Sequence, residues 1–268
     1  TNSVNRRCCH DPCRNRHCIG SETCPNLNTS HDDYLKLLRE IRSVKGVKKV
    51  FVRSGLRYDY VLADHNKAFV KELCQYHVSG QLKVAPEHVV KHVTDLMGKA
   101  DVHAFLKFKD WFDEANRELG KKQYLVPYFM SSHPGCTLKD AVALAEFLRD
   151  MHMQPEQVQD FIPTPGSLST AMYYTGLNPL TGEKVYVARR PEEKQMQRAL
   201  MQYKNPANYD IVYKALCLAG RRDLIGYGPK CLIAPRRHQA GRRPDKAGRH
   251  AAPPRRQGRG PAKTRKFR

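Results

Sequence analysis

The stretch QYLVPYFMSSHPGCTLKDAVALAEFLRDM, residues 123–151, contains the pattern that decides the fold. Its first seven residues are rich in aromatic and branched side chains and predict a strand over 123–129. The polar turn SSHPG follows, and the rest predicts a helix because apolar residues recur at helical spacing. That apolar stripe consists of Leu138, Val142, Ala145 and Leu148. A strand, a short turn and a helix in this order are the repeating unit of a parallel α/β fold.

The same alternation continues on both sides of this unit. Further helices are expected at 31–44, 66–77, 89–96 and 101–119, and further strands at 47–53, 81–88 and 157–163. Ser30 is expected to cap the first helix. A repeat of about 35 to 40 residues leaves room for crossover connections, which indicates a parallel sheet. An open doubly wound sheet and part of a (β/α) barrel both fit, and either fold places its chemistry at the carboxyl ends of the strands.

Small or polar residues follow each expected strand. The four turns begin SGLRYD, PEH, SSHPG and TPGSLST. Ordinary βα turns also collect Gly, Pro and Ser, so Lys83 and Glu87 would then pair with each other, and His88 and His133 would be satisfied turn histidines. No G-x-G-x-x-G, P-loop, G-x-S-x-G or H-E-x-x-H motif occurs, which removes the best support for dinucleotide, nucleotide, serine-hydrolase and zinc-protease functions.

The segment RRCCHDPCRNRHCIGSETC, residues 6–24, holds five of the nine cysteines. They are Cys8, Cys9, Cys13, Cys18 and Cys24. Four thiolates at such short spacings can converge on one zinc ion or one iron–sulfur cluster, and the neighbouring arginines would lower the thiol pKa values. The paired C-x2-C knuckles of structural zinc are missing. The residues alone leave open an iron–sulfur cluster, a zinc site, or unligated and redox-active thiols.

Charge is concentrated at the C-terminus. Residues 236–268 contain ten arginines and three lysines against one aspartate, a net charge of +12 out of +21 for the chain. This Pro-, Gly- and Arg-rich stretch has almost no apolar content and is expected to form a disordered basic tail. Such a tail can bind nucleic acid non-specifically through the phosphates. A solubilising extension is the favoured interpretation, because no aromatic residues are interleaved for base stacking.

No segment is expected to enter a membrane. No apolar run approaches the roughly 20 residues that span a bilayer. The chain starts at Thr1 without a basic and then apolar leader, which also fits a chain that is a fragment. We expect a cytoplasmic protein.

Long blocks of the sequence resemble the C-terminal portion of the YgiQ-type (UPF0313) radical S-adenosylmethionine (SAM) proteins. The resemblance covers roughly residues 6–235. The blocks are RCCHDPCRNRHCIGSETCPNLNTSH, GVKKVFVRSGLRYDYVL, VSGQLKVAPEHV, GKKQYLVPYFMSSHPGCTLKDAVALAEFLRDM, QVQDFIPTPGSLSTAMYYTGLNPLTGEKVYV and RALMQYKNPANYDIVYKALCLAGRRDLIGYGPKCLIAP.

The resemblance implies part of a radical-SAM-type (β/α) barrel that binds a [4Fe–4S] cluster and SAM. In that family the cluster reduces SAM to a deoxyadenosyl radical, which abstracts hydrogen from a substrate that is unassigned. The radical-generating cluster is held there by C-x3-C-x2-C, a spacing that does not occur in these 268 residues. We therefore expect a C-terminal fragment that does not cleave SAM by itself.

The resemblance also implies roles for particular residues. It places the cysteines on a separate segment that would hold an auxiliary iron–sulfur cluster through Cys8 or Cys9, then Cys13, Cys18 and Cys24, with zinc as the alternative metal. It places four strand-end residues against the SAM and substrate cavity. These are Lys83, Glu87, Ser132 and His133.

Four parts of the chain follow from this interpretation. They are a cysteine-rich segment (1–30), the C-terminal part of a barrel (31–180), a helical extension (181–235) and the basic tail (236–268). Two other functions stay open at this point. One is a zinc-stabilised nucleic-acid-binding protein that uses the tail. The other is an inactive fragment whose exposed sheet edge promotes aggregation.

Overall fold

The computed structural model describes residue 24 and residues 27–64, 66–155 and 158–236. The chain divides after Pro235 into two units, and every element below belongs to the first of them. The helices are α1 (Asp32–Ser43), α2 (Tyr58–Ala63), α3 (Lys67–Glu72), the π-helical turn η1 (Leu73–His77), α4 (Lys91–Met97), α5 (Val102–Glu118), α6 (Leu138–Asp150), α7 (Leu168–Thr175), α8 (Pro191–Met201) and α9 (Tyr209–Leu218). The strands are β1 (Gln81–Glu87), β2 (Tyr124–Ser131) and β3 (Gln159–Asp160). Short 3₁₀ turns cover Pro206–Asn208 and Arg222–Leu224.

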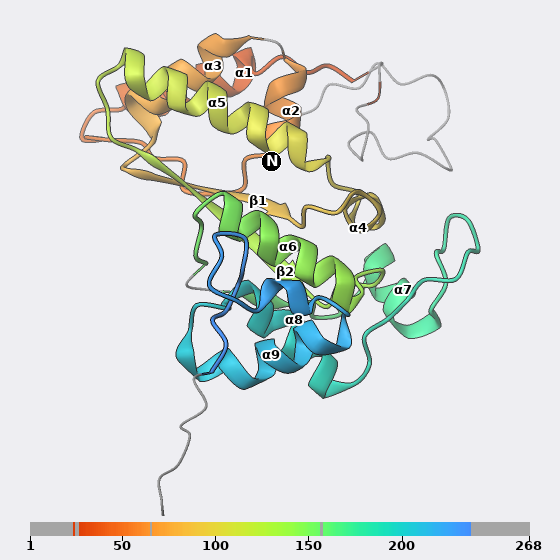
Figure 1. Ribbon diagram of the computed structural model, residues 1–268. Helices are drawn as coiled ribbons and strands as arrows, with labels where there is room; N and C mark the ends of the chain where they lie inside the picture. The colour runs from red at the N-terminus through yellow and green to blue at the C-terminus, as the bar shows by residue number, and fades with distance from the viewer. Residues whose placement is uncertain (1–23, 25–26, 65, 156–157, 237–268) are drawn as a thin grey trace, which may run out of the picture. The chain divides into compact units, whose positions relative to one another are not determined.

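The three strands form a parallel sheet in the order β1-β2-β3. Gln81 is paired with Tyr124 at the start of the β1–β2 ladder, and Met130 is paired with Gln159 at the start of the short β2–β3 ladder. Helices connect the strands, with α5 between β1 and β2 and α6 between β2 and β3 (Figure 1). The prediction of an α/β fold with parallel strands is confirmed. In the described part of the chain this sheet is not closed into a barrel.

One face of the sheet carries the core. Leu82 and Val84 on β1 are buried, and they belong to the same apolar cluster as three phenylalanines of α5. These are Phe105, Phe108 and Phe112, all fully buried. Removing each such ring from water stabilises the fold by about 1.5–3 kcal/mol. On the neighbouring strand, Phe129 packs with Leu144 and Leu148 of α6. Helices therefore cover this face of both strands.

The local signals for helix ends were only partly correct. Helix α6 begins with a capping box, in which Thr137 and Asp140 each accept from the other's backbone N–H. Ser30 was expected to cap α1, but the N-cap residue is His31. The hydroxyl of Ser30 still accepts a hydrogen bond from the N–H of Asp32, at 3.1 Å, one residue away from the expected arrangement.

Two expected strands differ from the structure. Residues 47–53 have no regular secondary structure and belong to no named strand. Two backbone bonds tie this segment to its neighbours: Val52 N–H donates to the carbonyl of His77, and Lys83 N–H donates to the carbonyl of Arg53. The strand expected at 157–163 shortens to Gln159–Asp160. Beyond it, Phe161 N–H still donates to the carbonyl of Ser131, at 2.8 Å.

A second helical layer follows the sheet. Helices α8 and α9 pack against α6 in an apolar cluster that includes Val142, Leu200 and Leu216, all fully buried. None of the helices in the described ranges combines the length and the apolar character needed to cross a bilayer.

Candidate functional site

The backbone turns sharply at the carboxyl ends of β1 and β2. Glu87 has φ of 66° and Ser132 has φ of 61°, so two non-glycine residues occupy the left-handed region at adjacent strand ends. At the first of these, His88 N–H donates to the carbonyl of Pro86, at 2.8 Å, which closes a tight γ-turn around Glu87. Each such conformation costs about 1–3 kcal/mol, and residues of this kind concentrate at ligand sites.

The strain at the end of β2 can be measured by substituting Ser132. Its hydroxyl is buried and has no hydrogen-bond partner among the described residues, so replacing it breaks no hydrogen bond there. We expect Ser132→Gly to be more stable than Ser132→Ala by about 1–2 kcal/mol, because only glycine relieves the left-handed strain. Urea unfolding of both variants checks this. Equal stabilities would mean that the strand end relaxes instead of storing strain.

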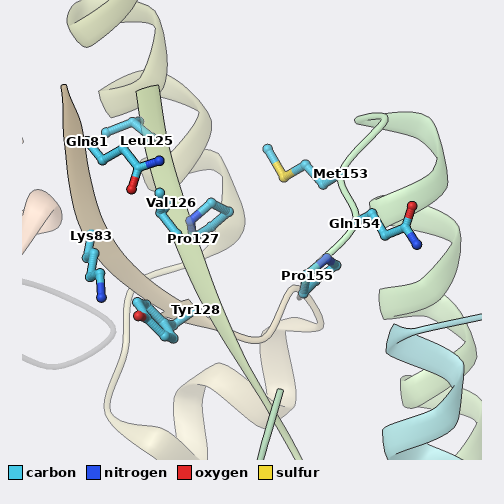
Figure 2. Close-up of a pocket in the computed structure, with 9 residues that line it drawn as sticks. All are labelled: Gln81, Lys83, Leu125, Val126, Pro127, Tyr128, Met153, Gln154 and Pro155. Atoms are coloured by element: carbon cyan, nitrogen blue, oxygen red, sulfur yellow. The ribbon is translucent and has the colours of Figure 1, made fainter. Parts of the chain in front are cut away.

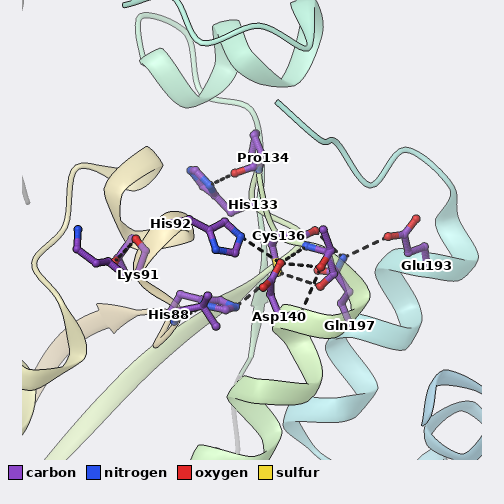
Figure 3. A network of polar contacts seen from close by, with 12 residues as sticks. His88, Lys91, His92, His133, Pro134, Cys136, Asp140, Glu193 and Gln197 are labelled. Atoms are coloured by element: carbon purple, nitrogen blue, oxygen red, sulfur yellow. Dashed lines mark hydrogen bonds and ion pairs between the residues drawn. The ribbon is translucent and has the colours of Figure 1, made fainter. Parts of the chain in front are cut away.

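His88 and Cys136 meet behind the first turn (Figure 3). The Nε2 atom of His88 lies 3.5 Å from Sγ of Cys136, and its Nδ1 accepts from Val90 N–H at 3.1 Å. Burial lowers the pKa of His88 to about 4, and burial raises the pKa of the Cys136 thiol. The pair is therefore a neutral imidazole and a neutral thiol at pH 7. A second histidine, His92 on α4, places Nε2 3.3 Å from Oδ2 of Asp140.

His133 has a defined tautomer. Its Nδ1 lies 2.7 Å from the carbonyl of Pro134, which can only accept, so Nδ1 carries the proton. Its Nε2 therefore accepts from the hydroxyl of Ser169 at 2.8 Å, near the start of α7. Burial lowers the pKa of His133 to about 4. His88 and His133 therefore both have hydrogen-bond partners in the neutral form. The sequence analysis expected this if the segments after the strands are ordinary βα turns.

Gln197 of α8 fixes the loop after β2. Its Oε1 accepts from Ser132 N–H at 2.9 Å, and its Nε2 donates to the carbonyl of Cys136 at 3.0 Å. The side chain is fully buried. A helix more than 60 residues further along the chain therefore holds the strand end in place.

The opposite face of the sheet is only partly covered. Gln81 and Lys83 alternate with the buried residues of β1, and Lys83 is paired with Val126 across the ladder. A pocket of about 430 Å³ lies along β2, where residues 125–128 from both faces of the strand line it together with Gln81 and Lys83. The ammonium of Lys83 lies 5.5 Å from the centre of the Tyr128 ring. Figure 2 shows the loop 153–155 on the other side of this pocket. Its volume falls in the range of small-molecule sites.

The four strand-end residues proposed from the sequence do not share one pocket. Lys83 lines the pocket of Figure 2. Glu87 has Lys99 as its charged neighbour, at 3.4 Å, and not Lys83. Burial raises the pKa of Glu87, and Lys99 opposes that shift. Ser132 and His133 are buried in the polar network instead.

The cysteine predictions fall mostly outside the described ranges. Cys8, Cys9, Cys13 and Cys18 lie outside the described residues, whereas Cys24 is a free, half-exposed thiol. Within the described ranges, no three or more His, Cys, Asp or Glu side chains are grouped so that they could hold a metal ion.

Gln197 and the Cys136–His88 pair were missed by the sequence analysis. The sequence analysis assigned no role to Cys136, and no local pattern links it to His88, 48 residues away. The sequence signal for Gln197 is a glutamine flanked by Met196, Ala199 and Leu200, on the apolar side of a helix.

The fold and the polar strand ends define an α/β protein with a parallel sheet whose loops, at the carboxyl ends of the strands, are held by buried hydrogen bonds. A family described as "Domain of unknown function (DUF3362)" matches residues 156–267. A UPF0313 protein of Clostridium perfringens is 59% identical over 221 residues, which cover 82% of this chain and 33% of that protein. A UPF0313 protein of Methanocella arvoryzae is 57% identical over 83% of this chain and 37% of its own length, and one of Clostridium botulinum is 54% identical over 84% and 35%.

The chain is a homologue of the UPF0313 proteins. It spans about a third of the length of these curated relatives. The resemblance found in the sequence is confirmed to that extent.

Proposed function

We propose that this chain supplies the C-terminal part of the (β/α) barrel of a radical SAM, iron–sulfur enzyme whose substrate is unassigned. The observation that carries the proposal is the succession β1–α5–β2–α6–β3, in which helices cover the face of the parallel strands that carries Leu82 and Val84, and Gln81 and Lys83 of the other face contribute to a pocket along β2. In a (β/α) barrel the helices lie outside and the remaining strand face lines the interior. The relatives are more than twice as long as this chain and so have the length to provide the missing strands.

The open face offers groups that fit SAM. Lys83 would pair with a carboxylate, and the Tyr128 ring beside it would stack on an adenine. Glu87 and Lys99 would close the strand end of this face. Ser132 and His133 would act from behind it, by fixing the loop that bounds the cavity.

The auxiliary cluster belongs to the same proposal. Cys24 is half-exposed and free, as a ligand must be before metal binds. Cys8 or Cys9, Cys13 and Cys18 would complete the set of thiolates, and a bound [4Fe–4S] cluster would supply one-electron chemistry there. Thiols stay reduced in the cytoplasm, which suits such a site.

Metal content after anaerobic reconstitution with iron and sulfide tests this proposal. We expect the chain to bind iron with matching acid-labile sulfide, and the triple variant Cys13→Ala, Cys18→Ala, Cys24→Ala to lose both. The double variant Cys217→Ala, Cys231→Ala is the control, because both thiols are free and partly exposed but lie elsewhere. Zinc in place of iron would favour a structural metal site. If neither the unmodified chain nor the double-variant control binds metal, the cluster is removed from the proposal.

A further inference from the structure

A strongly basic segment lines a groove that shares no residue with the pocket of Figure 2. The stretch RSVKGVKKVFVRSGLR, residues 42–57, contains six basic residues and no acidic residue. One aromatic residue, Phe51, is interleaved with these charges. Interleaved aromatic and basic residues are the combination that the C-terminal tail lacks.

The fold brings this segment against residues 75–79, and a groove lies between them. The groove measures about 340 Å³, and residues from 42–51, 75–79 and position 121 line it. Phe51 is 43% exposed and Tyr76 is 44% exposed, so the groove has an aromatic ring from each side. The guanidinium of Arg42 lies 4.0 Å from the centre of the Tyr76 ring, and the ammonium of Lys49 lies 5.9 Å from that of Phe51.

Three cations of this groove have no ion-pair partner within the described part of the chain. Arg42, Lys48 and Lys49 form no ion pair with any described residue, and Nη1 of Arg42 is shielded from solvent without a hydrogen-bond partner. The neighbouring carboxylate, Glu72, is held by Arg39, whose Nε lies 2.7 Å from it. Lys121 is occupied differently, because its ammonium donates to the backbone carbonyls of Cys74 and Gln75. The groove therefore presents unpaired cations between two exposed rings.

We propose that this groove binds single-stranded nucleic acid, with phosphates on Arg42, Lys48 and Lys49 and with bases stacked on Phe51 and Tyr76. Stacking on exposed rings requires unpaired bases, which a duplex does not offer. A membrane surface would engage the charges without needing the rings. The inference does not depend on the radical SAM proposal, because it uses neither the cysteines nor the open face of the sheet.

Fluorescence anisotropy with a labelled oligouridylate of about 12 nucleotides tests the groove in the full chain. We expect Phe51→Ala, which leaves the charge unchanged, to weaken binding by roughly 5- to 150-fold. The double variant Lys48→Glu, Lys49→Glu should weaken binding and make the slope of log affinity against log salt shallower by about 0.7 for each phosphate that is no longer neutralised. Lys139→Glu, Lys184→Glu is the matched control, since it makes the same charge change at two exposed lysines outside the groove.

The basic tail is present in every variant and in the control, so a difference in affinity between a groove variant and the control reflects the groove. Thermal unfolding of each variant shows that the fold is retained, as expected for substitutions at exposed positions. Two results would overturn the proposal. One is equal affinity of wild type, Phe51→Ala and the control. The other is a Lys48→Glu, Lys49→Glu defect that is just as large with heparin or with phosphatidylserine vesicles, combined with no effect of Phe51→Ala.

Discussion

Acidification from pH 7 to pH 5 is expected to lower the free energy of unfolding by about 2 kcal/mol through each of His88 and His133. Both imidazoles are almost completely buried. Burial lowers the pKa of each to about 4 in the folded protein. In the unfolded chain a histidine titrates near 6.5.

Acid lowers the free energy of unfolding because the two states bind different numbers of protons. Between pH 6.5 and pH 4 the unfolded state binds a proton at each of these positions that the folded state does not bind. Acid therefore favours the unfolded state throughout this window, and the loss levels off below about pH 4. The hydrogen bonds also require the neutral form of each imidazole. Nδ1 of His88 accepts from Val90 N–H, and Nε2 of His133 accepts from the hydroxyl of Ser169. Protonation would break one hydrogen bond at each site.

Urea unfolding at pH 7 and pH 5 measures the effect. Asparagine replaces each imidazole but keeps a polar atom near Nδ1, so His88→Asn and His133→Asn should each flatten the pH dependence by about 2 kcal/mol, whatever they cost at pH 7. His103→Asn is the control, because the side chain of His103 is 87% exposed. If the two buried-site variants keep the wild-type difference between pH 7 and pH 5, these histidines bind protons in the folded protein as readily as in the unfolded chain, and the expectation is wrong.

The strand–turn–helix units were predictable because their signals are local. The apolar stripe and capping residues of α6 lie within 138–150 and its preceding turn, and β1 shows its alternation directly in the sequence. The segment 47–53 has similar strand propensity, but whether it completes a ladder depends on neighbours that sequence spacing does not show. The short helix α2 was missed for the same kind of reason, since its six residues are held by tertiary packing on α5.

The candidate site was less predictable than the fold. The sequence identified strand ends, and Glu87 and Ser132 are indeed the positions where the backbone turns left-handed. It did not identify which side chains meet there. Lys99 replaces Lys83 as the partner of Glu87, and Gln197 reaches the loop from a distant helix. Such contacts depend on three-dimensional packing between elements that are not neighbours in the chain.

Gln197→Leu is expected to lower the free energy of unfolding by about 2–5 kcal/mol. Leucine has a similar volume, so packing in the core is retained, but Ser132 N–H and the Cys136 carbonyl both lose their partner. Each buried polar group left without a hydrogen bond costs about 1–3 kcal/mol. Gln195→Leu is the control, because Gln195 lies on the same helix and is exposed, and such a change shifts stability by no more than about 0.5 kcal/mol.

Gln197→Leu also tests whether α8 is part of the strand-end site. Helix α8 lies within the residues matched by the DUF3362 family, whereas Ser132 lies outside them, at the end of β2. Amide hydrogen exchange at Ser132 should accelerate in Gln197→Leu by more than the global loss of stability explains, because its N–H is released locally. Exchange that follows global unfolding alone would show that α8 stabilises the fold without fixing this loop. Local acceleration would mean that the C-terminal helices shape the cavity end of the sheet, so the two regions must be tested for ligand binding together.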